Sequence, residues 1–232
     1  MIEIKKGNIF TTECQTIVNT VNTVGVMGAG IAYEFKLRFP EMFQKYKQFC
    51  DNNQMSIGNL WIYKLKEYNN ENFKFVLNFP TKEHWKYHTR VEYLEKGLQK
   101  FINTYKEKGI KSIAFPLLGA SKGGLDEETS IKIMTKYLEK VDIPVEIWYF
   151  DPKAKDDLYK EFKSKFINLD IYIIKEQSKL RIDLINKIKI ALQKDDINSL
   201  NGLLKVKGIG DNTLEKSFRF IKNYKSQTLF DI

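Results

Sequence analysis

Short strand-like runs alternate with segments of helical spacing over the first 168 residues, and this alternation constrains the fold more than any other feature of the sequence. The predicted strands are rich in β-branched and aromatic residues and cover 2–4, 15–22, 60–63, 73–79, 112–116 and 145–150. The predicted helices cover 31–39, 41–50, 88–107, 127–140 and 153–166. Strands and crossover-length helices in alternation are typical of α/β domains, so we predict a largely parallel sheet with helices on both faces.

The alternation stops near residue 168. Beyond it the strand-like runs disappear, and 178–193 and 196–206 have helical spacing. We therefore predict an α/β domain at 1–168 and a small all-α domain at 169–232, although no Pro-rich or Gly/Ser-rich linker marks the boundary. The second segment holds 12 basic against 8 acidic residues.

The charge balance favours polyanionic partners. Lys and Arg number 38 against 29 Asp and Glu, a net charge of +9, which makes nucleic acid the leading candidate. The alternative is genome composition, because nearly all of the excess is Lys in a chain rich in Ile and Asn. No apolar run approaches the roughly 20 residues of a membrane helix, and the N-terminus lacks the apolar core of a signal peptide. We expect a cytoplasmic protein without a membrane partner.

Two glycine-rich loops follow two different predicted strands. The first holds Gly25, Gly28 and Gly30, and the second spans 117–126. Glycines let backbone N–H groups approach a phosphate closely, since no Cβ intervenes. Neither loop matches the GxGxxG dinucleotide motif or the GxxxxGK[ST] phosphate loop, which argues against a Rossmann dehydrogenase and a Walker NTPase. Each loop alone is explained by a tight turn, but the pair favours a nucleotide diphosphate site.

Four segments together resemble a known family. They are residues 7–10, the run NTVNTVGVMGAGIA at 19–32, the run NFPTKEHW at 78–85, and the glycine-containing loop at 116–126. They resemble the macrodomain family, and more narrowly the DarG-type DNA ADP-ribosyl glycohydrolase antitoxins, over residues 1–168. The resemblance implies a three-layer α/β/α macrodomain that holds ADP-ribose in a cleft over the strand ends.

The resemblance also implies the roles of individual residues. The loop from Asn22 to Ile31 would wrap the distal ribose, and backbone N–H groups of 119–125 would hold the diphosphate. Asn8 and Ile9 would lie at the adenine end, where many macrodomains have an Asp in place of Asn8. Phe150 would either stack on adenine or be an ordinary core aromatic. The expected ADP-ribose contacts are Asn8, Ile9, Asn22, Thr23, Val24, Met27, Gly28, Gly30, Ile31, Thr81, Leu117, Gly119, Ala120, Ser121, Lys122, Gly123, Gly124, Leu125 and Phe150.

Lys82 is the expected catalytic residue, since the lysine of the NFPTK segment is catalytic in the family that this chain resembles. A lysine with a lowered pKa attacks an opened sugar aldehyde as an amine, while an ammonium protonates a leaving group. The alternative is a solvated surface lysine. His84 and His88 have i,i+4 spacing but no third ligand, so no metal is expected. His84 would orient Lys82, contact substrate, cap a helix or pack, and Asp126 is expected to cap the next helix.

Residues 204–214 resemble a helix-hairpin-helix motif. Its backbone N–H groups and the following helix N-terminus would contact a DNA phosphate without reading sequence. The expected DNA contacts are Lys205, Lys207, Gly208, Gly210 and Lys216. The alternative is that this helix pair is a packing unit.

These observations predict a DNA ADP-ribosyl glycohydrolase that reverses a DarT-type toxin. The expected partners are ADP-ribose, ADP-ribosylated DNA and a cognate DarT-type toxin, with no cofactor and a monomeric state. Two alternatives are a non-catalytic ADP-ribose reader or toxin-sequestering partner, and a hydrolase that acts on ADP-ribosylated protein. Lys82 in its motif disfavours the reader, and the basic tail disfavours the protein-directed hydrolase.

Overall fold

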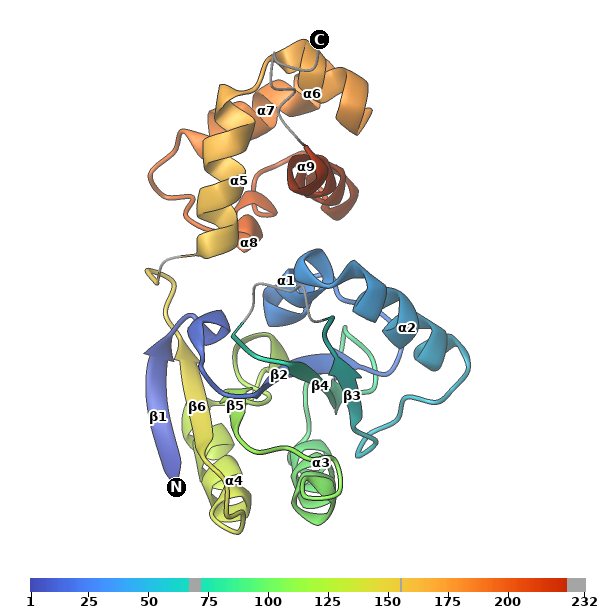
Figure 1. Cartoon of the computed structure of the whole chain (residues 1–232), viewed down its shortest axis with the longest axis vertical. Coiled ribbons are helices and arrows are strands. Elements are labelled where there is room, and N and C mark those ends of the chain that lie inside the picture. Colours follow the sequence, from blue (N-terminus) through green and yellow to red (C-terminus); the bar gives the residue numbers. More distant parts are fainter. Residues whose placement is uncertain (67–71, 155, 225–232) are drawn as a thin grey trace. The chain divides into compact units, whose positions relative to one another are not determined.

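The computed structural model describes residues 1–66, 72–154 and 156–224, and the chain divides into two compact units, Met1–Ala154 and Lys155–Ile232 (Figure 1). The connection between the strands predicted at 60–63 and 73–79 includes residues 67–71, which lie outside the described residues. Among the helices in the described ranges, none is long and apolar enough to cross a membrane.

The first unit is a six-stranded sheet between two pairs of helices (Figure 1). Its elements are β1 (Ile2–Gly7), the 3-10 turn η1 (Ile9–Thr11), β2 (Thr16–Asn22), α1 (Gly30–Arg38), α2 (Pro40–Asp51), β3 (Trp61–Lys64), β4 (Phe75–Lys82), α3 (Val91–Thr104), β5 (Ile113–Pro116), the 3-10 turn η2 (Ser121–Gly123), α4 (Glu127–Leu138) and β6 (Val145–Phe150). Helices α1 and α2 cover one face of the sheet, and α3 and α4 cover the other. The predicted three-layer α/β/α fold is confirmed.

The strand order is β1-β6-β5-β2-β4-β3. Every pairing is parallel except that of β3 with β4, which is antiparallel. The carboxyl ends of β1, β6, β5, β2 and β4 therefore lie at one edge of the sheet, which is where open α/β sheets bind ligands.

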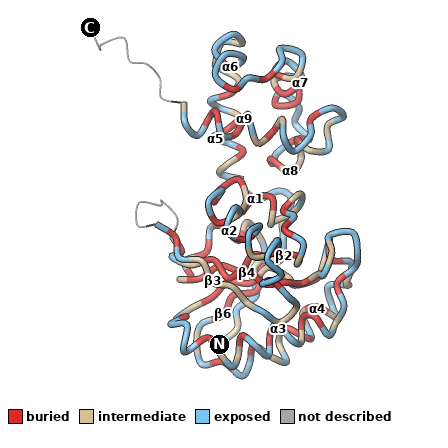
Figure 2. The backbone as a smooth tube through the Cα atoms, turned by 90° about the vertical axis from the view of Figure 1, so that its right-hand side faces the viewer, coloured by how far each residue is buried: buried red, intermediate tan, exposed pale blue. Residues whose placement is uncertain are grey.

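Buried strands separate two apolar cores, and Figure 2 shows these strands in red at the centre of the first unit. Side chains of β2 alternate between the cores: Ile17 and Val21 pack with α1 and α2, while Val18 packs with α3 and α4. Because both faces of β2 are covered, its side chains are almost all buried, as in a central parallel strand.

The helical unit begins earlier than the sequence predicts. Its helices are α5 (Asp157–Asn168), α6 (Ile171–Ser178), α7 (Ile182–Leu192), α8 (Leu200–Leu203) and α9 (Asp211–Asn223). The sequence predicts a boundary at 168, but α5 packs with the helices that follow it. Phe162 stacks on Phe218 with ring centroids 6.3 Å apart, and the Tyr159 hydroxyl donates to the Ile197 carbonyl at 2.5 Å.

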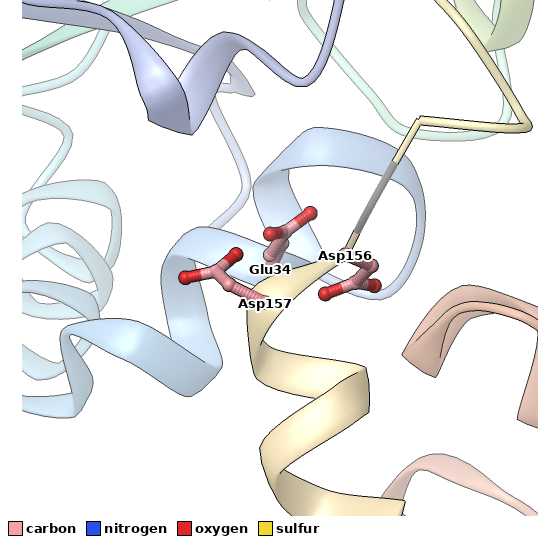
Figure 3. A group of neighbouring side chains, drawn as sticks. All are labelled: Glu34, Asp156 and Asp157. Carbon is pink, nitrogen blue, oxygen red and sulfur yellow. The ribbon is translucent and has the colours of Figure 1, made fainter.

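Polar caps set the ends of these helices. Asp156 caps α5 by accepting from the Tyr159 N–H at 2.9 Å, and Figure 3 shows Asp156 and Asp157 at its first turn. The predicted helix at 178–193 begins later, at Ile182, because Lys179 ends α6 in a left-handed conformation with φ of 56°. The predicted helix at 196–206 shrinks to the four residues of α8, since Ser199 caps it by accepting from the Gly202 N–H.

Candidate functional site

Lys82 lies at the end of β4, where the pairing with β2 shifts register. Up to Val21 the two strands pair without interruption, and then Asn22 lies opposite Lys82. Such a shift redirects the side chains that follow it. The Lys82 side chain is half-buried, and its Nζ donates to the backbone carbonyl of Lys122 at 2.5 Å. The catalytic candidate therefore joins the end of β4 to the second glycine-rich loop.

The pKa of Lys82 is lowered from its ordinary value. Burial disfavours the charged form, and the positive charge of Lys122 acts in the same direction. Among the described residues, no carboxylate offsets these two causes. A larger share of Lys82 is therefore a neutral amine than of a solvated lysine at the same pH.

The first glycine-rich loop is built around the Asn22 side chain. Its Oδ1 accepts from the N–H groups of Val24 and Val26, and its Nδ2 donates to the Val26 carbonyl at 2.5 Å. The hydroxyl of fully buried Tyr46 donates to the Asn22 carbonyl at 2.7 Å. Gly25 takes a φ of 76° within this loop, a conformation that favours glycine. The loop is thus shaped before any ligand binds.

The first loop is also fastened beside Lys82. The N–H and hydroxyl of Thr23 both donate to the Glu83 carbonyl, at 3.3 and 2.7 Å. At the far end of the loop, a Cβ on Gly30 would lie 3.8 Å from Cγ of Lys122. The two loops and Lys82 therefore meet at one place.

The second loop uses part of its backbone to hold its own shape. The N–H groups of Gly123, Gly124 and Leu125 donate to carbonyls within the loop. Within the described part of the chain, the N–H groups of 120–122 make no backbone hydrogen bond. Ser121 takes a positive φ of 53° beside these amides. Successive N–H groups in such turns form anion-binding concavities, so the amides at 120–122 are donors available to an anion.

Residues 88 and 89, in the segment after Lys82, contact the second loop. The Thr89 N–H donates to the Gly123 carbonyl at 2.8 Å. A Cβ on Gly124 would lie 1.8 Å from Nδ1 of His88, and Gly124 has a φ of 84°, so this position requires glycine on both counts. His88 thus packs against the loop, and Asp126 caps α4 by accepting from the Thr129 N–H.

The residues expected at the adenine end lie on neighbouring strand ends. Phe150 ends β6 opposite Gly7 of β1, and Asn8 follows directly. Phe150 is 74% exposed, which excludes the core alternative. The Asn8 side chain accepts from the Phe10 N–H and caps η1, so part of its hydrogen-bonding capacity serves the local fold.

The expected contacts of the first unit all lie at the carboxyl ends of strands or directly after them. Asn8 and Ile9 follow β1, Phe150 ends β6, Asn22 ends β2 and is followed by Thr23, Val24, Met27, Gly28, Gly30 and Ile31, Thr81 and Lys82 end β4, and after β5 come Leu117, Gly119, Ala120, Ser121, Lys122, Gly123, Gly124 and Leu125. Val24 and Val26 are exposed on the first loop, whereas Met27 is buried beneath it. One edge of the sheet thus carries the candidate site.

Sequence reasoning missed residues that shape this site from a distance. Tyr46 on α2 and Thr89 before α3 bind the two loops, and nothing in their local sequence indicates these contacts. His84 accepts from the Lys86 N–H and stacks on Trp85, so it shapes a turn and makes no contact with Lys82 among the hydrogen bonds of the described residues.

The expected DNA contacts lie in the helical unit. Lys205, Lys207, Gly208 and Gly210 are exposed in the turn between α8 and α9, and Lys216 is exposed on α9. Gly208 takes a φ of 89°, and Gly210 begins α9 without a side-chain cap. The turn is anchored by Ile209, which is buried and donates its N–H to the Val206 carbonyl.

Comparison with known proteins identifies relatives of the first unit. The Macro domain family profile matches residues 18–134. A DNA ADP-ribosyl glycohydrolase from Thermus aquaticus is 38% identical over 152 residues, which cover 66% of this chain and 41% of that protein. The chain thus spans about two fifths of the length of such curated relatives.

Solved structures agree with these matches. The macrodomain of Mycobacterium tuberculosis DarG is 36% identical with a TM-score of 0.61, and the match covers 64% of this chain and 97% of that one. Thermosipho africanus DarTG, solved in complex with ADP-ribose, is 34% identical with a TM-score of 0.59, over 65% of this chain and 41% of that one.

Proposed function

The chain belongs to the macrodomain family, and from that premise we propose that it is a DNA ADP-ribosyl glycohydrolase, which removes ADP-ribose from a nucleobase in DNA. The observation that carries the proposal is the hydrogen bond from Lys82 to the Lys122 carbonyl, which brings a lysine of lowered pKa to the loop proposed to bind the diphosphate. The names of the similar proteins support the choice of DNA as the carrier of the adduct.

Different parts of the proposed site bind different parts of ADP-ribose. The amides at 120–122 bind the diphosphate, the first loop encloses the distal ribose, and Phe150 stacks on adenine beside Asn8. Exposed Val24 and Val26 cover the apolar face of the sugar. These contacts hold the ADP-ribose end and leave the bond to the nucleobase beside Lys82.

The reaction breaks the bond between the base nitrogen and C1″ of the distal ribose. Water supplies the hydroxyl that C1″ gains and the proton that the base gains. The lowered pKa of Lys82 raises the share of its amine form. In the proposed step the distal ribose opens while C1″ is still joined to the base nitrogen as an iminium, the Lys82 amine adds to C1″, and the bond from C1″ to the base breaks as the lysine–sugar imine forms. The base leaves with a proton that the lysine amine gives up. Water then releases the sugar from the lysine.

The test is release of ADP-ribose from two carriers. The full chain is incubated with a defined ADP-ribosylated oligonucleotide and with an ADP-ribosylated protein, and free ADP-ribose is measured. We expect fast release from the oligonucleotide and little from the protein. Preference for the protein carrier would favour the protein-directed hydrolase, and tight ADP-ribose binding without release from either would favour a reader.

We propose further that the helical unit binds DNA through the turn between α8 and α9. The exposed lysines at 205, 207 and 216 and the uncapped start of α9 present positive charge and free N–H groups to a phosphate. Because the proposed substrate is DNA, we propose that the enzyme acts in the cytoplasm. We also propose that it is a monomer. Light scattering coupled to size exclusion tests the monomer.

A second candidate role is binding of a DarT-type toxin. A similar protein from Thermosipho africanus is a fusion of a DNA ADP-ribosyl transferase with a DNA ADP-ribosyl glycohydrolase, which shows the two activities in one chain. Co-purification of this chain with a transferase tests that role. Retention of the transferase by a Lys82→Ala variant would separate binding from catalysis.

A further inference from the structure

The loop that follows Lys82 carries the aromatic rings of His84, Trp85 and Tyr87. We call residues 84–87 the aromatic loop. The Tyr87 N–H donates to the His84 carbonyl at 3.1 Å and closes a turn. The His84 ring lies 5.4 Å from the Trp85 ring, nearly parallel to it, and 5.4 Å from the Tyr87 ring. The turn therefore holds the rings together as one surface.

Two of these three rings are exposed to solvent, and the His84 side chain is half-buried. Trp85 is 49% exposed and Tyr87 is 67% exposed. Neither belongs to the two core clusters found among the described residues of the first unit. Large aromatic side chains dominate the energetics of interfaces, and their exposure without a packing role marks a surface that binds something.

One cation lies over a ring of the aromatic loop, and a second follows the loop in sequence. The Lys86 ammonium lies 5.1 Å from the centre of the Trp85 ring, and Arg90 lies over Tyr93 at 5.6 Å. Glu83 is the one acidic residue of the segment 83–90, and its negative charge contributes to a raised pKa of Tyr93. Interleaved aromatic rings and cations are the pattern that binds single-stranded nucleic acid, since bases stack on the rings and phosphates meet the charges.

We propose that the aromatic loop stacks the bases next to the modified nucleotide of a single DNA strand. The proposal rests on the proposed function, because it concerns the part of the substrate beyond ADP-ribose. Trp85 follows Lys82 by three residues, which span at most roughly 10 Å. That distance corresponds to about three nucleotides at 3.4 Å per step. The loop thus reaches the neighbours of a base whose glycosidic bond lies at Lys82.

Tryptophan fluorescence tests the stacking directly. The chain has three tryptophans, of which Trp148 is buried and Trp61 packs edge-on against Phe49. Trp85 is the exposed one, so stacking of a base should quench its emission. We expect quenching by an unmodified single-stranded oligonucleotide, no quenching by an abasic strand of equal length, and no quenching in Trp85→Phe.

Kinetics test whether the stacking serves catalysis. An ADP-ribosylated oligonucleotide and an ADP-ribosylated mononucleoside share the reacting bond, but only the first has neighbouring bases. Stacking is worth about 1–3 kcal/mol per base, so Trp85→Ala should raise KM for the oligonucleotide about tenfold more than KM for the mononucleoside. Trp85→Phe should restore most of that loss.

Tyr137→Ala is the matched control. Tyr137 also has lysines over its ring, Lys136 at 5.4 Å and Lys140 at 5.1 Å, but it lies at the end of α4, away from the carboxyl ends of the strands. It should leave the ratio of the two KM values unchanged.

Two results would overturn the proposal. The first is Trp85 emission that does not respond to bases. The second is a Trp85→Ala variant in which KM changes by the same factor for both substrates, as expected if the loop binds a protein instead. A wild-type chain that releases ADP-ribose from neither substrate would instead refute the proposed function, while base-dependent quenching would still support the stacking surface.

Discussion

The protonation and the position of the Lys82 amine depend on its burial and on Lys122. Burial and the charge of Lys122 both lower its pKa, while the Lys122 carbonyl accepts a hydrogen bond from its Nζ. The carbonyl fixes the position of the nitrogen, and the lowered pKa raises the amine fraction. The loop that is proposed to hold the diphosphate thus fixes the position of the Lys82 nitrogen and, together with burial, lowers its pKa.

Replacing Lys82 separates catalysis from binding. Lys82→Ala should lower ADP-ribose release by about 10²- to 10⁴-fold, the range typical of a lost catalytic group, while ADP-ribose affinity stays within about twofold. Lys82→Arg keeps the positive charge but supplies no amine, so it should be inactive as well. Single-turnover kinetics and calorimetry measure the two quantities. Retained turnover in Lys82→Ala would remove this residue from the mechanism.

A substitution of Lys122 can remove its side-chain charge and keep the backbone carbonyl that accepts from Lys82. In Lys122→Gln the pKa of Lys82 should rise toward its ordinary value, because one of the two causes that lower it is gone. If the amine is the reactive form, the rate rises with pH through that pKa, and the rising limb moves to higher pH in the variant. Lys132→Gln, which removes the charge of an exposed side chain on α4, is the control. A shift of the profile to lower pH would contradict the amine mechanism.

Among the elements, the second loop depends most on glycine. A Cβ on Gly119 would lie 2.8 Å from Leu125 and 3.0 Å from Thr89, and Gly119 also has a φ of 73°. Gly119→Ala should therefore cost about 2–4 kcal/mol of the free energy of unfolding and weaken ADP-ribose binding about tenfold or more.

Gly109→Ala provides the comparison for that loop. Gly109 has a φ of 66°, but nothing lies within 4 Å of the added methyl group. It should lower the free energy of unfolding by about 1–2 kcal/mol and leave ADP-ribose affinity unchanged. Chemical denaturation and calorimetry give both quantities for each variant. Equal affinities of the two variants would show that the loop does not bind the ligand.

The strands and glycine loops were predictable because their signals are local. A run such as 15–22 shows its β-branched character directly, and Pro40 marks where α1 gives way to α2. The short α8 was not, because capping by Ser199 competed with helical spacing. Contacts such as that of Tyr46 with Asn22 join residues 24 apart and have no sequence signal.

At the scale of the whole molecule, the net charge of +9 and the lysines of the helical unit predict salt-dependent DNA binding. Each phosphate contact contributes about 0.7 to the slope of log affinity against log salt for a single strand. Replacing Lys205, Lys207 and Lys216 by Gln should therefore reduce the slope by about 2.

The control for this experiment removes the same charge elsewhere. Lys108, Lys132 and Lys140 are exposed in the first unit, outside the helical one, and their replacement by Gln should change the slope much less. Fluorescence anisotropy at several salt concentrations measures both variants. Equal slopes would mean that the basic tail acts through general charge and that its turn is a packing unit.

The early start of the helical unit bears on how the chain can be divided for study. A fragment ended at residue 168 keeps α5 but removes the partners of its buried aromatic side chains, among them Phe218 beside Phe162. Such a fragment is expected to be poorly soluble, because it exposes Tyr159, Phe162 and Phe166 on one helix. A fragment ended at residue 154 omits that helix and is the better choice for crystallisation and for titration with ADP-ribose.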